Sequence, residues 1–393
     1  MYETKGRNMF LLWFGVAISI AEILTGMLVA PLGWKQGLWS IILGHIIGCG
    51  LFLLPAAYMS GRKHRSAIGV TELTFGQVGV KLFSLLNAIQ LIGWTAVMIV
   101  NAQIAMNEVS GYLFHFKSIL TMTIIVTILI SLWLLMDHEW LFKINNRVVI
   151  LLALGILLLI GSIMTTSHQL VNPVKLGKIS FGAAVELSVT MCLSWLPVIG
   201  DSTQNERYPQ KVSLASICGY FLGGCSMFAV GLLIVLKTGQ KDLMLTLLQT
   251  NLGLVALFII IFSTVTTTFM DAYSAVQSLQ ILFPRLTAKT LSLLVMVIGF
   301  VLAIGVSMHF YENFLSLIGA VFTPLFAILF ISIFVLKKRL ARVWNFVWWL
   351  VGSLAYYGLQ RLDFILGTTF LLLLVLSLGV YVTSIFTKTY SLQ

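Results

Sequence analysis

Long apolar segments separated by short polar connectors run along nearly the whole chain. This pattern predicts an all-α polytopic membrane protein, because one membrane span needs about 20 mostly apolar residues. Twelve spans are expected, roughly at residues 9–33, 38–60, 81–112, 118–137, 147–167, 180–200, 213–238, 251–283, 288–307, 311–336, 343–360 and 363–386. No polar stretch is long enough to fold as a soluble domain, so we expect one transmembrane domain over residues 1–393.

The positive charges predict the orientation of these spans. The chain has a net charge of +11 and 24 Lys and Arg residues. With a cytoplasmic N-terminus, 17 of the 24 fall on the inner side and 7 on the outer side, as the positive-inside rule requires. An even number of spans then places both termini in the cytoplasm, and we expect the cell (plasma or inner) membrane. The basic residues form no basic face, so a nucleic-acid partner is not expected.

The first ten spans repeat with an offset of about 170 residues: spans three and eight begin near 81 and 251, and spans four and nine near 118 and 288. Because five is an odd number, the second set enters the membrane from the opposite side. Such inverted repeats are typical of secondary transporters, whose binding sites lie on a broken helix from each half. The repeats are expected at 9–167 and 180–336, followed by two further spans within 343–386.

Carboxylates lie within three predicted spans, at Glu22, Glu186 and Asp271. A charge at bilayer depth costs about 2.5–3.5 kcal/mol on insertion scales and usually faces a cavity or a partner. A position near a helix end, from which the side chain reaches the interface, would explain Glu186 and Asp271. It does not explain Glu22, which lies near the centre of span one.

A break is also predicted in span six, within "MCLSWLPVIGDSTQ". Pro197 lacks an amide hydrogen and disfavours helix at the preceding residue, so the helix should break around Ser194–Leu196. Freed backbone groups at this depth survive only where protein, water or a ligand satisfies them. A proline kink repaired by neighbouring helices is the alternative interpretation.

Hydroxyl side chains gather on one face of span eight. In "STVTTT", Ser263, Thr266 and Thr267 are neighbours at positions i, i+3 and i+4. Such hydroxyls either bond back to helix carbonyls or offer hard oxygen donors to an alkali cation.

A stripe of amide and indole side chains runs along span three. Gln90, Trp94 and Asn101 share one face of this helix. An indole can stack on a flat heteroaromatic ligand and the amides can pair with its edge. Aromatic residues are also common near membrane interfaces, which is the alternative explanation for Trp94.

The remaining reactive side chains do not indicate an enzyme. The six His residues are scattered over different segments, and the four Cys residues lie inside apolar segments without a CxxC pair. Neither pattern predicts a disulfide, a metal cofactor or a catalytic triad. We therefore expect no cofactor, and neither an enzyme nor a channel.

Five segments together resemble the nucleobase:cation symporter-1 family. They are "FGVAISIAEILTG", "QLIGW", "SWLPVIGD", "STVTTTFMDAYSA" and "FLSLIGAVFTPLFAIL". The sequence is most similar to the family's cytosine permeases and its CytX-type permeases for hydroxymethylpyrimidine, a thiamin precursor. The resemblance implies a LeuT-type 5+5 inverted repeat with broken helices one and six, and cation-coupled import of a small heteroaromatic substrate across the lipid bilayer. No obligate protein partner is implied.

The resemblance also implies two sites. The coupling ion, expected to be Na⁺, would be held by the carbonyls of Gly15, Ile18 and Ser263 and by the hydroxyls of Thr266 and Thr267. The implied substrate-binding residues are Ser19, Glu22, Gln90, Trp94, Ser194 and Trp195.

Three departures from the cytosine permeases bear on the substrate. The chain has "TTTF" from Thr266 where those permeases have "TTND", its Gln90 and Trp94 are spaced one residue wider, and Glu22 has no acidic counterpart. An aminopyrimidine fits these changes, because a carboxylate can pair with an exocyclic amine and a ring nitrogen at two points. Coupling to protons, with Glu22 as the proton carrier, is the alternative to Na⁺.

Overall fold

The computed structural model describes residues 5–135, 138–165, 172–240, 253–305 and 311–392, with a few side chains inside the helices also left out. These residues form helices and one short antiparallel ribbon, in which β1 (Lys338–Leu340) pairs with β2 (Thr389–Ser391). The helices of the first half are α1 (Gly6–Ala17), α2 (Ile20–Leu28), α3 (Gly33–His45), the π-helix η2 (Ile46–Leu53), α4 (Leu54–Lys63), α5 (Glu72–Phe114), α6 (Ile119–Leu135) and α7 (His138–Thr165). Those of the second half are α8 (Phe181–Ser194), the 3₁₀-helix η5 (Ile199–Ser202), α9 (Pro209–Thr238), α11 (Gly253–Leu282), α12 (Ala288–Gly305), α13 (Tyr311–Phe330) with the π-helix η7 (Ile331–Leu336), α14 (Arg342–Leu359) and α15 (Thr368–Phe386).

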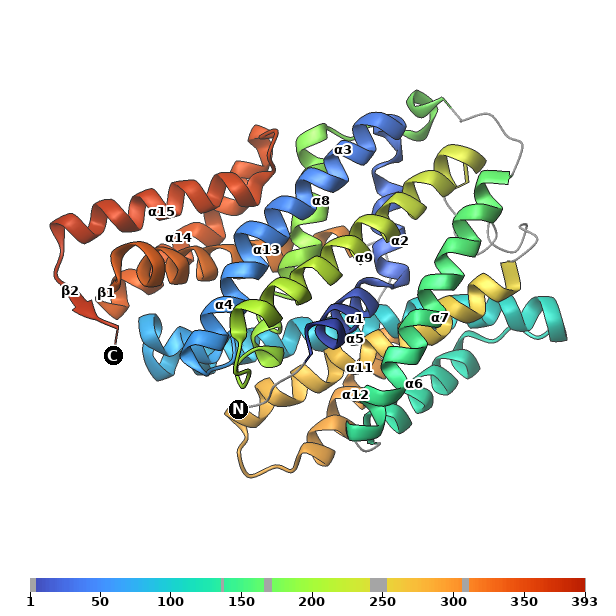
Figure 1. Ribbon diagram of the computed structural model, residues 1–393, viewed down its shortest axis with the longest axis horizontal. Helices are drawn as coiled ribbons and strands as arrows, with labels where there is room; N and C mark the ends of the chain where they lie inside the picture. The colour runs from blue at the N-terminus through green and yellow to red at the C-terminus, as the bar shows by residue number, and fades with distance from the viewer. Residues whose placement is uncertain (1–4, 136–137, 166–171, 241–252, 306–310, 393) are drawn as a thin grey trace.

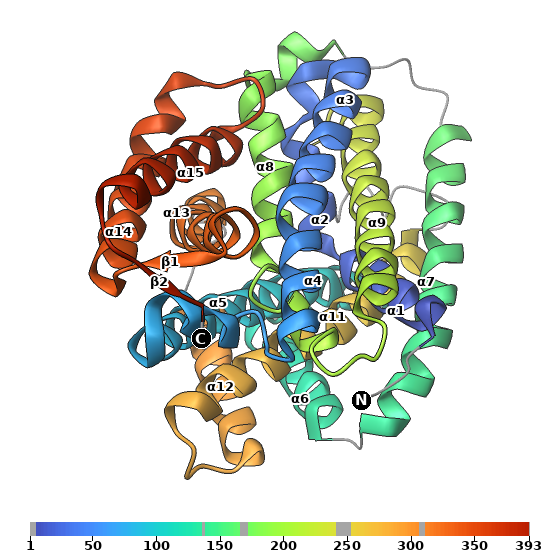
Figure 2. The same cartoon turned by 60° about the vertical axis from the view of Figure 1, so that its left-hand side comes forward.

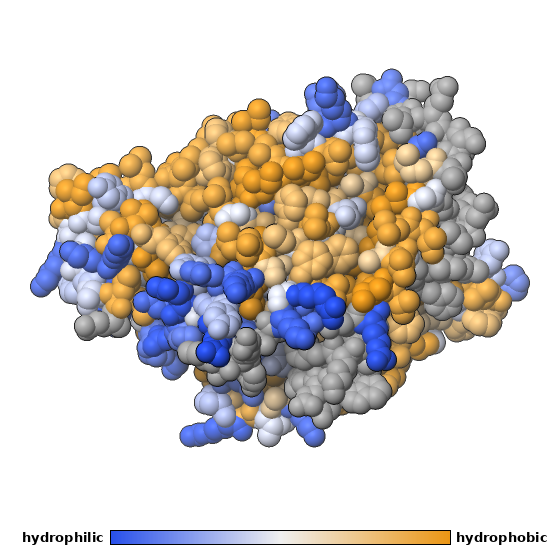
Figure 3. Space-filling model, viewed as in Figure 1, coloured by the Kyte–Doolittle hydropathy of each residue, from blue (hydrophilic) through white to orange (hydrophobic). Residues whose placement is uncertain are grey.

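Each predicted span overlaps one helix or one group of consecutive helices, which confirms the all-α expectation. Six helical segments of the described chain are long and apolar enough to cross a membrane, and a seventh qualifies if the bent pair α1–α2 is one span. Figure 3 shows an apolar surface over the middle of the molecule, with hydrophilic residues gathered toward its upper and lower edges. This is the surface expected of a protein that lies in a bilayer.

The helices are arranged around the bent pair α1–α2. Both members of this pair pack on α9, α3 packs on α8, and α5 packs on α11. Figures 1 and 2 show α14 and α15 beside α13 on one side of the molecule and α7 on the other, with α6 and α12 toward the lower edge. The first and sixth spans therefore lie in the interior, where the sequence predicts the site.

Glycines allow α2 and α9 to approach each other at the level of the backbone. A Cβ atom at Gly231 would overlap the carbonyl of Ile23, and one at Gly26 would overlap the backbone of Phe228. Small residues permit such close contacts between membrane helices, where van der Waals packing stabilises association. This contact fixes α9 against the helix that carries Glu22.

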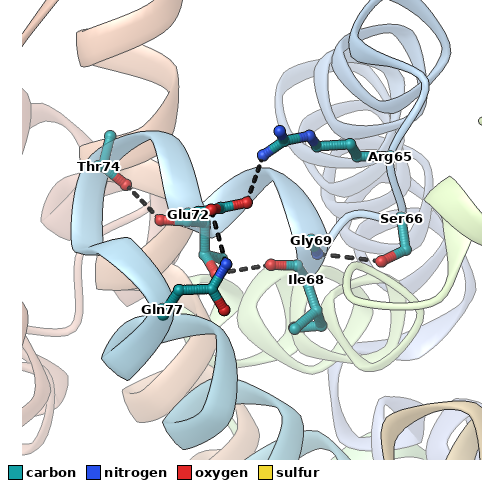
Figure 4. A network of polar contacts seen from close by, with 8 residues as sticks. Arg65, Ser66, Ile68, Gly69, Glu72, Thr74 and Gln77 are labelled. Carbon is teal, nitrogen blue, oxygen red and sulfur yellow. Dashed lines mark hydrogen bonds and ion pairs between the residues drawn. The ribbon is translucent and has the colours of Figure 1, made fainter. Parts of the chain in front are cut away.

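Polar contacts fold the connector between α4 and α5 into a compact turn (Figure 4). Arg65 forms an ion pair with Glu72 at 2.6 Å, and Gln77 donates to the same carboxylate at 2.7 Å. The hydroxyl of Ser66 accepts from the amide of Gly69 at 3.0 Å. The connector thus satisfies its own polar groups at the entrance to α5.

Glu186 joins the sixth span to the last two helices. Its Oε1 accepts from the Tyr356 hydroxyl at 2.7 Å and the Thr369 hydroxyl at 2.6 Å, while Oε2 accepts from the Thr369 amide at 2.9 Å. Only 8% of Glu186 is exposed. The residue is therefore an internal anchor between α8, α14 and α15, and does not reach the membrane interface as its position near the end of span six had suggested.

We expect Glu186→Ala to lower the stability by about 3 kcal/mol or more, because three buried donors would lose their acceptor. Thermal unfolding in detergent measures this loss as a lower Tm. Tyr356→Phe is the matched control, since it removes one of the three hydrogen bonds and should cost about 1 kcal/mol. An unchanged Tm of the Glu186→Ala variant would contradict the anchoring role.

Candidate functional site

The first span is broken at its centre. The helix α1 ends at Ala17, α2 begins at Ile20, and the two helices are bent by 58°. Between them, Ile18 has φ −80° and ψ 88°, and Ser19 is extended. The Ser19 hydroxyl accepts from the amide of Glu22 at 3.3 Å, so it caps the restarted helix. Because the backbone here is not helical, carbonyl groups can turn away from the helix axis.

The sixth span ends its regular helix three residues before Pro197. The last residue of α8 is Ser194, within the predicted break. The amides of Trp195 and Leu196 then bond to carbonyls only three residues back, at 3.1 and 3.0 Å. The Ser194 hydroxyl donates to the carbonyl of Met191 at 2.7 Å. The Ser194 hydroxyl is thus used within its own span, and it is the carbonyl of Ser194 that accepts a hydrogen bond from another helix, from Gln90 of α5.

Glu22 is buried beside a tyrosine of α9. Only 2% of Glu22 is exposed, and its Oε1 accepts from the Tyr220 hydroxyl at 2.8 Å. Its Oε2 has no hydrogen-bond partner within the described residues. Buried polar atoms are almost always paired, so an orphaned carboxylate oxygen indicates a missing partner.

The side chains of span three present two more unsatisfied atoms. Gln90 donates to the carbonyl of Ser194 at 2.9 Å and to Asn87 at 3.0 Å, but its Oε1 has no partner in the part of the chain that is described. The same holds for the indole N–H of Trp94. The bond from Gln90 brings α5 directly to the break of span six.

Aromatic rings connect the two broken spans. Trp195 lies edge-on to Trp13 with centroids 5.8 Å apart, and Trp13 lies edge-on to Tyr220 at 6.3 Å. Trp94 of α5 lies edge-on to the ring of Tyr311 of α13, with centroids 6.0 Å apart. The predicted residues Glu22 and Trp195 are thus linked through Tyr220 and Trp13.

The sequence interpretation missed Trp13, Tyr220 and Tyr311. The Tyr311 hydroxyl lies 2.9 Å from that of Thr25 on α2, which ties α13 to the first span. Each of these residues is an aromatic side chain with a polar atom inside an apolar span, and this feature could have pointed to them. Such residues are also common at membrane–water interfaces, so the feature does not identify a site.

One of the predicted cation-binding residues of α11, Ser263, contacts the break of span one. The hydroxyl of Ser263 donates to the carbonyl of Ile18, and the carbonyl of Gly15 accepts from the amide of Ile18 at 3.1 Å. The hydroxyl of Thr267 is buried and without a partner among the described atoms. The side chain of Thr266 lies outside the described residues. Carbonyl and hydroxyl oxygens are donors that suit a hard cation.

One protein family matches the chain over nearly its whole length. Residues 3–390 match the family described as "Permease for cytosine/purines, uracil, thiamine, allantoin". The chain belongs to this permease family. It is a multi-pass membrane transporter and not an enzyme, as the sequence predicts. No curated protein matches the chain by sequence.

Solved transporters share the fold of this permease. Mhp1, a nucleobase-cation-symport-1 family transporter in a closed conformation with bromovinylhydantoin bound, has a TM-score of 0.76 and 16% identity over 96% of this chain and 92% of Mhp1. Inward-facing Mhp1 has a TM-score of 0.74 and 16% identity, with 95% and 89% covered. A Na⁺-coupled sialic acid symporter in an outward-open state has a TM-score of 0.70 and 15% identity, with 99% and 92% covered. The LeuT-type fold of the permease is thereby confirmed.

Proposed function

We propose that this permease imports a pyrimidine-type substrate, hydroxymethylpyrimidine or a related nucleobase or thiamin precursor, by alternating access coupled to Na⁺. The observation that carries the proposal is a set of buried atoms around the two breaks that have no partner among the described residues: Glu22 Oε2, Gln90 Oε1 and the Trp94 indole N–H. Two acceptors and one donor suit the edge of a heteroaromatic ring that bears an amine.

In the proposed mechanism, Na⁺ binds between the break of α1–α2 and α11 and favours the outward-open form. The aminopyrimidine then docks between Trp94 and Trp195, with Gln90 and Glu22 against its edge. Both ligands stabilise closure, and the helices rock inward around the two broken spans.

The proposed cation ligands are the carbonyls of Gly15, Ile18 and Ser263 and the hydroxyls of Thr266 and Thr267. The buried, unpartnered Thr267 hydroxyl supports this assignment. All the assigned ligands are neutral oxygen atoms, which suit a monovalent hard cation such as Na⁺. None of them has to gain or lose a proton when the ion binds.

The proposed topology follows the positive-inside rule. Both termini lie in the cytoplasm and the chain lies in the cell (plasma or inner) membrane. Residues 9–167 and 180–336 form the two repeats, and residues 343–386 form two additional spans. The anchor at Glu186 connects this additional pair to the second repeat.

Proton coupling is the second candidate, and one observation favours it. Within the described structure, the side chain of the buried Glu22 has one hydrogen-bond partner, Tyr220, and buried carboxylates often carry protons in transporters. In that mechanism Glu22 would take up a proton together with the substrate and release it on the inner side.

Thermal-shift measurements on the purified protein test the proposed substrate class. A panel of nucleobases and thiamin precursors is screened with Na⁺ and with choline in its place. We expect aminopyrimidines to raise the Tm, and to raise it more with Na⁺ present, because ligands that bind the native state stabilise it. A shift by purines or hydantoins alone would contradict the proposed substrate.

A further inference from the structure

A second set of oxygen atoms lies along α11 beyond the predicted cation site. Five buried polar side chains share one face of this helix over about 22 Å of its length, at intervals of three or four residues. They are Ser263, Thr267, Asp271, Ser274 and Ser278, each 5% exposed or less. Ser263 contacts the carbonyl of Ile18 at the break of span one, so the stripe begins at the predicted cation site.

Asp271 is the least satisfied carboxylate of the described interior. Only 2% of it is exposed, its Oδ2 has no hydrogen-bond partner, and neither ion pair of the described chain involves it. By contrast, the carboxylate of Glu186 accepts three hydrogen bonds. A buried carboxylate without a partner is strongly unfavourable unless a cation or a proton neutralises it.

A second carboxylate approaches the same stretch of α11 from the broken span six. Asp201, in η5, accepts from the Ser274 hydroxyl at 3.5 Å. On α11, Thr267 lies four residues before Asp271 and Ser274 lies three residues after Asp271, so the three side chains are neighbours on one face. Asp201 of η5 therefore contacts the face of α11 that carries Asp271 and Thr267, and no described basic side chain is paired to either carboxylate.

We propose that Asp271, Asp201 and the Ser274 hydroxyl form a second, inner site for a monovalent hard cation, which Thr267 connects to the site at the break of span one. The proposal rests on the Na⁺ coupling proposed above. Carboxylate and hydroxyl oxygens are the ligands that such cations take. In the proposed topology α11 runs toward the cytoplasm, so the inner site lies on the side to which the coupling ion is released.

Equilibrium binding of ²²Na⁺ to the purified full-length protein tests the inner site. We expect two Na⁺ ions per wild-type chain. Asp271→Asn and Asp201→Asn, which alter the inner site, should each bind one. Thr266→Ala, which alters only the site at the break of span one, should also bind one. The Na⁺ affinity of the altered site should fall by about tenfold or more, since even the loss of a residue that only hydrogen-bonds to a metal ligand changes metal affinity by that much. Ser278→Ala is the matched control on the same stripe and should keep both ions.

The melting temperature without Na⁺ separates a binding role from a structural one. Asparagine removes the unpaired buried charge at nearly constant volume, so Asp271→Asn should melt at or above the wild-type temperature while its Na⁺-induced shift becomes smaller. A lower melting temperature with an unchanged Na⁺ shift would overturn the proposal.

The remaining outcomes are also decisive. If Asp271→Asn and Asp201→Asn keep the wild-type number of Na⁺ ions, the inner site is wrong while the proposed coupling stands. If Asp271→Asn loses substrate binding and keeps every Na⁺ ion, Asp271 belongs to the substrate site, and the inner site is again wrong. If the wild-type protein binds no Na⁺, the proposed Na⁺ coupling fails, and the inner site fails with it.

Discussion

Glu22→Gln will abolish high-affinity binding of an aminopyrimidine while leaving the protein folded. The substitution keeps an oxygen for the Tyr220 hydroxyl, which now bonds Oε1 at 2.8 Å, so the packing of α2 on α9 should be retained. It removes the charge from the oxygen that has no partner in the described structure. Loss of a charge-assisted, two-point pairing should weaken binding by about 100-fold, equivalent to about 3 kcal/mol. Equilibrium binding of labelled hydroxymethylpyrimidine measures the loss.

Tyr220→Phe is the matched control for this prediction. It removes the donor from Oε1 and leaves the carboxylate in place, so the loss of affinity should be about tenfold or less. Thermal unfolding of both variants shows whether the fold is kept. If Glu22→Gln binds the aminopyrimidine as tightly as the wild type, Glu22 does not belong to the substrate site.

Replacing both Thr266 and Thr267 by Ala will shift the sodium dependence of uptake to much higher Na⁺ concentrations. The double substitution deletes the two proposed hydroxyl ligands from α11 and leaves only the proposed carbonyl ligands, those of Gly15, Ile18 and Ser263. The apparent affinity for Na⁺ should fall by about 100-fold, because a hard cation needs several oxygen donors at once. Uptake into proteoliposomes is measured over a range of external Na⁺ concentrations.

The next threonine of the same run supplies the control. The Thr268 hydroxyl donates to the carbonyl of Thr264 at 2.6 Å within α11, so it bonds back to its own helix. Thr268→Ala should therefore keep the sodium dependence of the wild type. An unchanged apparent affinity for Na⁺ in the double variant would show that the cation site has been assigned to the wrong residues.

The fold was predictable because membrane helices follow directly from apolar length. The break of span six also followed from one residue, since Pro197 cannot continue a regular helix and α8 ends at Ser194. The anchor at Glu186 was not predictable. Its partners Tyr356 and Thr369 lie 170 and 183 residues away along the chain, and no sequence pattern links side chains over that distance.

Part of the candidate site could be predicted from the sequence, because polar residues in apolar spans stand out. Glu22, Gln90 and Trp94 each keep an unsatisfied atom in the described interior. Ser19 and Ser194 differ from the expectation in detail, since their hydroxyls bond the backbone of their own spans. Local capping competes with ligand binding for short hydroxyl side chains, and only the backbone geometry shows which is satisfied.

Uptake of labelled hydroxymethylpyrimidine into proteoliposomes under imposed gradients tests whether the permease couples import of a pyrimidine to Na⁺. The purified protein is reconstituted, and uptake is followed with an inward Na⁺ gradient at equal pH and with an inward proton gradient in choline. We expect accumulation with the Na⁺ gradient and none with the proton gradient alone. Accumulation driven by protons without Na⁺, or no uptake of the pyrimidine under either gradient, would contradict this expectation.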